Sequence, residues 1–267
     1  SIGYLRGNSE QNQTRFYAYV SLSIFAVMGI AFASNLFTFF LFYELLTLLT
    51  YPLVTHNGSS NAKQGGKIYL GLLLFTSICF LLLAICITYS FADTLDFTKG
   101  GILPTDLSHT EITILLLIFC FGVGKAALFP FHGWLPAAMV APTPVSALLH
   151  AVAVVKAGVF GIIKIIVYIF GIDYLQEITA ISILTVVAGF TIIFASYKAI
   201  KSTNLKQRLA YSTVSQLSYI TMAASLATPL AIAAAIFHLL SHAFGKITLF
   251  FAAGSIYTSL HKTEINE

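Results

Sequence analysis

Charged side chains are scarce in this sequence. Only 9% of its 267 residues are Asp, Glu, Lys or Arg, whereas 58% are hydrophobic. A water-soluble domain usually has about 25% charged residues, because its surface must be polar. The apolar surface here is too large for a water-soluble core of this size, which leaves lipid as the solvent. The composition therefore predicts an integral membrane protein.

Cysteine is equally scarce, and its placement excludes several kinds of site. The three cysteines, Cys79, Cys86 and Cys120, lie within apolar runs and belong to no Cys-x-x-Cys or Cys/His spacing. Such residues usually pack as small apolar side chains. The chain also lacks a nucleotide-binding fingerprint and a flavin site. We therefore expect no disulfide, metal or cofactor, and no redox chemistry within the chain itself.

The sequence also lacks the features of a signal peptide and of a soluble domain. The polar stretch 1–15 contains no apolar segment, so it is not a secretory signal. The longest polar segment, Asp93–Glu111, is predicted to be a surface connection. The net charge of +4 is small, and we expect no nucleic-acid partner. We therefore treat 1–267 as a single transmembrane domain, and its start at Ser1 suggests a fragment or truncated product of a longer chain.

Long apolar runs are what the sequence does have. A bilayer core of about 30 Å needs roughly 20 apolar residues per helix. Apolar runs and their polar breaks predict an all-α polytopic membrane protein with about eight transmembrane helices, one or more of them broken. The predicted spans are Phe16–Ser34, Leu36–Thr55, Ile68–Phe91, Ile112–Trp134, Pro144–Gly171, Ile178–Ile200, Leu209–Leu226 and Leu230–Tyr257.

The loop charges segregate by sign under this threading. One side holds Arg6, Arg15, Lys63, Lys67, Lys198, Lys201, Lys206, Arg208 and Lys262 against Glu10, Glu264 and Glu267. The other side holds Lys99 against Asp93, Asp96, Asp106, Glu111, Asp173 and Glu177. Basic loops face the cytoplasm. We therefore expect both termini to face the cytoplasm in a bacterial inner membrane or, alternatively, the matrix in a mitochondrial inner membrane.

Five charged residues remain inside the predicted spans. They are Glu44, Lys125, Lys156, Lys164 and Lys246. Each costs on the order of 3 kcal/mol near the bilayer centre, so it should face the protein interior or water. An anchor would have no use for such residues. They indicate a path for protons or cations.

Glu44 and Lys125 are predicted to lie opposite one another. Pro130 follows Lys125 closely and breaks the helix, while Gly122 and Gly124 allow close approach of a neighbour. A broken helix with a buried charge is typical of a transport site. A buried lysine that is paired with a carboxylate keeps its proton, and an unpaired one releases it, so toggling the pair would move a proton. The alternative is a fixed structural ion pair.

The eighth span carries a row of titratable side chains. His238, His242 and Lys246 recur every four residues, so they form one stripe about 12 Å long on a single helix face. Imidazole donates and accepts protons near neutral pH, which makes this stripe a candidate proton wire. The alternative is that these side chains are satisfied core residues.

Other polar residues of the spans have weaker assignments. His150 and Lys156 are six residues apart, roughly 120° out of phase, so we expect them to contact different neighbours. Lys164 either extends to the interface or joins the path. His132 is interpreted as a contact at the helix break or as a relay. The last set is expected to line the interior, either facing water or bonding across helices: Tyr211, Ser212, Thr213, Ser215 and Gln216.

Several of these segments resemble one known family. They are Gly124–Pro130, His132–Pro136, Ala141–His150, Leu209–Gln216 and Ile236–Lys246. Together they are similar to the antiporter-like membrane subunits shared by respiratory complex I (NADH:quinone oxidoreductase) and Mrp-type cation/proton antiporters. The resemblance covers nearly the whole chain, and the combination of segments is specific.

The resemblance implies a fold, site residues and partners. It implies a subunit of about fourteen helices with two inverted repeats, of which this chain would hold the fourth to the eleventh helix. It also implies that the partners are other membrane subunits, the lipid bilayer, protons and, in an antiporter, Na⁺. The candidate proton-path residues, from this resemblance and from the buried charges, are Glu44, Lys125, His150, Lys156, His238, His242 and Lys246.

Some residues depart from the family pattern. Ala137 stands where many members have an acid, and Asn204 stands where many have Asp. The most similar complex I member has an acidic residue in its sixth helix, whereas the corresponding third span here has none. That member also has no lysine at the position that Lys156 occupies here. These features favour an Mrp D-type subunit of a cation/proton antiporter. The alternatives are a proton-pumping, non-redox subunit of complex I or a related redox complex, and a membrane scaffold with residual charges.

Overall fold

The computed structural model describes all residues except Ser1, Ser9, Glu177, Thr179 and Glu267. The described chain is a bundle of helices, and no β-strand occurs in it beyond two isolated bridges. The α-helices are α1 (Ile2–Gly7), α2 (Gln13–Phe32), α3 (Leu36–Val54), α4 (Ser60–Thr76), α5 (Leu82–Ala92), α6 (His109–Gly122), α7 (Trp134–Ala137), α8 (Thr143–Ala147), α9 (Val154–Ile165), α10 (Ile172–Gln176), α11 (Ala180–Lys201), α12 (Leu205–Ala224) and α13 (Pro229–Leu260).

Short turns of other geometry join these helices. The 3₁₀ turns η2 (Gly124–Ala126), η3 (Phe131–Gly133) and η4 (Ala138–Val140) flank α7. The π-helical turns η1 (Ser77–Leu81), η5 (Leu148–Val152) and η6 (Ile166–Phe170) lie within longer helices. Consequently 60–92 and 143–170 each form one long helix that contains π-turns.

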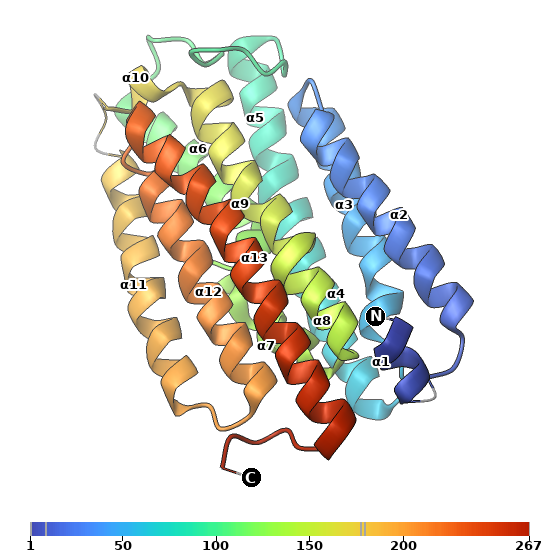
Figure 1. Ribbon diagram of the computed structural model, residues 1–267. Coiled ribbons are helices and arrows are strands. Elements are labelled where there is room, and N and C mark those ends of the chain that lie inside the picture. The colour runs from blue at the N-terminus through green and yellow to red at the C-terminus, as the bar shows by residue number, and fades with distance from the viewer. Residues whose placement is uncertain (1, 9, 177, 179, 267) are drawn as a thin grey trace.

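The bundle confirms the expected polytopic helical fold. Six of the described helices are long and apolar enough to cross a membrane. The other two predicted spans correspond to α12 and to α6, which has 14 residues and continues into the broken segment at η2. Both termini lie at the same end of the bundle, together with the α3–α4 and α11–α12 connections (Figure 1). This arrangement agrees with the segregation of basic and acidic loops.

Polar side chains fix where the helices begin. Asn35 accepts the backbone N–H of Thr38 at the start of α3, and Ser59 accepts that of Ala62 at the start of α4. Ser108 and Glu111 form a reciprocal capping box at the start of α6. The first N–H groups of a helix have no partner within it, so such acceptors set the boundary.

The acidic end of the bundle is tied together by backbone bonds. The predicted surface connection after α5 pairs with the α2–α3 turn, because Leu36 N–H donates to Leu95 O and Phe97 N–H donates to Ser34 O. Ile102 N–H donates to Ile169 O at the end of the 143–170 helix. The short break at Ser34–Asn35 is therefore a real boundary between two helices that is held from outside.

One long helix occupies the centre of the bundle. The 143–170 helix is the most buried of the long apolar helices. Its α9 portion packs against α2, α3, α6, α12, α13 and η2. Large apolar side chains on the outer helices instead face outward, for example Phe32 (79% exposed), Ile193 (73%) and Phe244 (74%). This inside-out distribution is expected where lipid is the solvent, and it leaves the polar side chains of α9 in the interior.

Candidate functional site

A broken helix forms one half of the candidate site. α6 ends at Gly122, and the chain continues through η2 to Ala127, whose backbone is left-handed with φ of 55°. Glycine permits the close packing here: a Cβ at Gly122 would lie 2.5 Å from the backbone nitrogen of Leu81, and one at Gly124 would lie 2.1 Å from Thr76 Oγ1. The π-turn η1 therefore fits directly against the break.

Side chains from other helices satisfy the backbone groups that the break frees. The indole of Trp134 donates from Nε1 to the carbonyl of Gly124 at 2.9 Å. The backbone N–H of Lys125 donates to the hydroxyl of Tyr43 at 3.0 Å. Buried backbone groups left without partners would cost free energy comparable to a lost hydrogen bond, so these contacts hold the break open in one geometry.

Lys125 is fully buried against α3. Its Nζ donates to the carbonyl oxygen of Tyr43 at 2.9 Å and to Thr47 Oγ1 at 2.6 Å. The same ammonium lies 3.2 Å from the centre of the Tyr43 ring. A cation over an aromatic face gains about 2 kcal/mol when desolvated. Tyr43 thus contacts both the backbone and the side chain of Lys125, a role that the sequence alone did not indicate.

Glu44 lies near Lys125 but does not form the predicted ion pair. Among the described residues, no contact joins its carboxylate to the ammonium, and its Oε1 is buried without a hydrogen-bond partner. The carboxylate is within electrostatic range of Lys125, Tyr43 and Tyr69. The expected direct pair is therefore corrected: the ammonium binds Tyr43 and Thr47, on either side of Glu44 in the sequence.

The other half of the candidate site joins α9 to α13. Lys156 Nζ hydrogen-bonds to His242 Nδ1, and both side chains are buried, at 7% and 8% exposure. The rings of His238 and His242 stack with centroids 6.4 Å apart, and His238 Nε2 contacts Gln216 Oε1 at 2.9 Å. The structure therefore places the predicted α13 row in line with a lysine of the central helix.

Lys246 ends this row inside the bundle. Its Nζ donates to the carbonyl of Leu209 at 3.0 Å and to Ser212 Oγ. Both partners lie in the first turns of α12. Ser215 of the same helix contacts Ser196 at 2.9 Å. Three of the polar residues predicted to line the interior, Ser212, Ser215 and Gln216, thus bond across helices, and Ser212 and Gln216 contact the candidate site. Thr213 instead donates to Leu209 O within α12.

His150 packs against α13 without a polar contact. It is fully buried, both ring nitrogens lack a partner among the described residues, and its ring packs on Phe250 with centroids 5.5 Å apart. Lys156, expected to meet another neighbour, also contacts α13, through His242. The two side chains meet α13 at different residues, Phe250 and His242, which lie eight positions apart along that helix.

The central helix connects the two halves. A Cβ at Gly158 would lie 2.3 Å from the nitrogen of Ala126 and 2.3 Å from the carbonyl carbon of Lys125. α9 thus packs backbone to backbone on the broken segment. Lys156, two residues earlier, contacts α13. One rigid element therefore positions both Lys125 and Lys156.

Lys164 and His132 lie outside this arrangement. Lys164 Nζ donates to the carbonyl of Ala33 at 2.6 Å and lies 4.2 Å from the Phe97 ring, at the acidic end of the bundle. This contact supports the interfacial assignment over the path. His132 packs against Phe129 and Phe194, and its Nδ1 has no partner among the described residues.

The described residues contain no group of three or more His, Cys, Asp or Glu side chains placed to hold a metal ion. The three cysteines are free: Cys79 and Cys86 are exposed on the outer face, and Cys120 is buried. The side chains of this arrangement are suited to proton transfer. Amines and imidazoles in hydrogen-bond contact can pass protons between nitrogen atoms.

Known proteins share both the sequence and the fold. The chain is 36% identical to the chloroplast NAD(P)H-quinone oxidoreductase subunit 5 of Chara vulgaris, over 97% of its own length and 39% of that protein. It is 35% identical to the Glycine max subunit 5, over 94% of its own length and 33% of that protein. The chain thus spans little more than a third of the length of the curated relatives it matches.

Two solved structures match the fold. The Mrp complex of Dietzia sp. DQ12-45-1b matches with a TM-score of 0.82 and 28% identity, over 91% of this chain and 26% of that one. The membrane-bound sulfane sulfur reductase, an archaeal respiratory membrane complex, matches with a TM-score of 0.81 and 28% identity, over 92% and 50%. Residues 33–267 match the family model described as NADH:quinone oxidoreductase/Mrp antiporter, TM. The chain therefore belongs to the NADH:quinone oxidoreductase/Mrp antiporter transmembrane family.

Proposed function

We propose that this chain is the central segment of a proton-translocating membrane subunit in a quinone oxidoreductase complex. The proton path uses Glu44, Lys125, His150, Lys156, His238, His242 and Lys246. The partners are other membrane subunits of that complex, and the chain lies in an energy-converting membrane. Redox chemistry belongs to those partners.

The observation that carries this proposal is the buried hydrogen bond between Lys156 and His242. It joins two helices far apart in the sequence, and both side chains are shielded from lipid and bulk water. A proton that passes from Lys156 Nζ to His242 Nδ1 leaves a neutral amine and an imidazolium. The imidazolium then releases a proton from Nε2, which has no fixed partner among the described atoms. An imidazole with one hydrogen-bonded nitrogen and one nitrogen without a partner can accept a proton on one side and release one on the other.

Lys125 supports the same proposal from the other half. Its ammonium is held by neutral groups, a carbonyl and a hydroxyl, while the carboxylate of Glu44 lies nearby without a contact. In this proposal, side-chain rotation brings the two charges together during the transport cycle. A Lys125 ammonium that moves from these neutral groups to the Glu44 carboxylate holds its proton more strongly, because an opposite charge stabilises the charged form. When it returns, it holds the proton less strongly. A permanent ion pair would have no such freedom.

The redox-complex assignment rests on the relatives. The proteins matched at 35–36% identity over nearly the whole chain are named as subunits of NAD(P)H-quinone oxidoreductases. The alternative, an Mrp D-type subunit, was favoured by features of the sequence, and it is also supported by the fold, because an Mrp complex matches at a TM-score of 0.82. A cation/proton antiporter subunit therefore stands as the second candidate, and the first has the higher identity.

The test uses Lys156→Met in the full-length subunit within its assembled complex, reconstituted into liposomes. The variant keeps the length of the side chain and removes the proton-binding nitrogen. We expect proton uptake, followed by a pH-sensitive dye, to fall at least about tenfold while the complex stays assembled. Lys201→Met is the matched control, because that lysine is exposed at the end of α11.

The energy source separates the two candidates. Proton uptake driven by a quinone and an electron donor supports the redox complex, whereas uptake driven by an imposed Na⁺ gradient supports the antiporter. Normal uptake by an assembled Lys156→Met complex under both conditions would contradict the relay and favour a scaffold.

A further inference from the structure

An elongated groove lies on the outside of the bundle, away from the buried lysines. Two adjoining cavities form it, of about 490 Å³ and about 190 Å³, and they share Pro144 and Phe251. The larger cavity lies between α1, α8 and the end of α13, and the smaller one is closed on its other side by Phe16 and Val20 of α2. We call this feature the α2–α8–α13 groove.

The groove extends through about half of the membrane. Its lining along α13 runs from Ile247 to Ser259, which corresponds to about 18 Å at a rise of about 1.5 Å per residue. The hydrocarbon core is about 30 Å thick. The groove therefore has the length of one leaflet and not of a membrane-spanning helix from another subunit.

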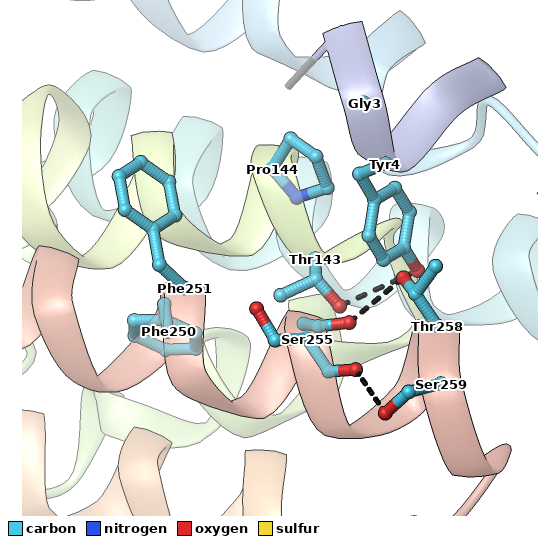
Figure 2. Close-up of a pocket in the computed structure, with 10 residues that line it drawn as sticks. Gly3, Tyr4, Thr143, Pro144, Phe250, Phe251, Ser255, Thr258 and Ser259 are labelled. Carbon is cyan, nitrogen blue, oxygen red and sulfur yellow. Dashed lines mark hydrogen bonds between the residues drawn. The ribbon is translucent and has the colours of Figure 1, made fainter. Parts of the chain in front are cut away.

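The lining changes from apolar to polar along this length. Figure 2 shows Phe250 and Phe251 at one end of the larger cavity, and Ser255, Thr258 and Ser259 toward the other. The polar end lies nearer the end of α13, at the basic face of the bundle. A glycerolipid changes in the same order as the groove lining, from an apolar hydrocarbon tail to polar ester groups.

A basic pocket adjoins the polar end. It has a volume of about 390 Å³ and shares Tyr4 and Thr143 with the groove. Its lining includes Lys206, His261 and Lys262, against one acid, Glu10. Basic groups at the membrane surface attract anionic lipid headgroups. The charge of this pocket therefore matches a phosphate-bearing headgroup.

We propose that the α2–α8–α13 groove binds one anionic phospholipid of the leaflet on the basic face. The tail lies along Phe251 and Pro144, the ester groups meet Ser255 and Ser259, and the phosphate enters the basic pocket. The lipid also lies against the wall of the proton path, because the Phe250 ring packs on fully buried His150. This site goes beyond the proposed function and stands without it.

The test measures lipid retention by the intact complex. The purified complex is titrated with phosphatidylglycerol or phosphatidylcholine and bound lipid is counted by native mass spectrometry. Ser255→Leu fills the groove from an exposed position, and Thr248→Leu is the control, because Thr248 is also exposed on α13 but lines neither cavity. We expect wild type and Thr248→Leu to retain phosphatidylglycerol, and Ser255→Leu to need about tenfold more of it, equivalent to about 1.4 kcal/mol.

A second variant addresses the headgroup without filling the groove. Lys262→Gln should reduce the preference for phosphatidylglycerol over phosphatidylcholine and leave the binding of phosphatidylcholine unchanged. Three results would overturn the proposal. The wild-type complex could retain both lipids equally, or the Ser255→Leu complex could bind phosphatidylglycerol as well as the wild type does. The third is that Ser255→Leu causes loss of a protein subunit and no loss of lipid. These readouts do not involve proton transport, so they are independent of the test of the relay.

Discussion

Gly158 offers a sharp test of how the central helix organises the site. Replacing it by alanine would place a Cβ 2.3 Å from the nitrogen of Ala126 and 2.3 Å from the carbonyl carbon of Lys125. Both are backbone atoms of the broken segment, so no flexible side chain can yield. Either α9 or η2 must shift, and a shift of α9 also moves Lys156 relative to His242.

The magnitude follows from two opposing terms. Forcing an extra methyl group into a packed interior typically costs about 1–3 kcal/mol. Alanine in a helix gains about 0.5–1 kcal/mol over glycine. Gly189 of α11 provides the matched control, because a Cβ there meets no atom within 4 Å. The gain of alanine over glycine is common to both sites, so we expect Gly158→Ala to be less stable than Gly189→Ala by the overpacking cost, about 1–3 kcal/mol.

The assay is unfolding of the full-length subunit in mixed micelles, combined with proton uptake by the reconstituted complex. Gly158→Ala should unfold at lower denaturant and lose uptake, whereas Gly189→Ala should match or exceed the wild type in both. Equal stability and equal uptake of the two variants would refute the backbone-to-backbone packing of α9 on the broken segment, and with it the argument that one helix positions both lysines.

Two further predictions concern other contacts. Tyr43→Phe keeps the ring under the Lys125 ammonium but removes the acceptor of the Lys125 N–H, so we expect a loss of about 1–3 kcal/mol in the same unfolding assay; wild-type stability would count against this bond. Hydrogen bonds from Thr203 and Asn204 hold the pKa of Glu264 below its ordinary value. The tail contact is therefore complete above the unfolded pKa of about 4.3 and weakens as pH falls through the lower folded value. The protection factors of residues 261–266, which are corrected for the intrinsic pH dependence of amide exchange, should fall at acidic pH, and Glu264→Gln should remove that fall; a persistent fall would exclude this carboxyl.

The sequence by itself determined the class and the threading of this protein. Low charge and long apolar runs require lipid as the solvent, and eight runs with segregated loop charges admit one orientation. The break near Pro130 and the interior position of Lys125, Lys156 and Lys246 also followed, because helix-breaking residues and buried charges have local causes. These features depend on composition and spacing along one chain segment.

Only the tertiary structure decided which side chains meet. Lys125 binds Tyr43 and Thr47 instead of Glu44, and this choice depends on the rotation of α3 relative to a non-helical segment. His150 and Lys156 both contact α13, at Phe250 and at His242, although their spacing places them on different faces of a regular helix. Sequence periodicity fixes the face of a regular helix, but partners across a bundle depend on irregular turns and on atoms many residues away.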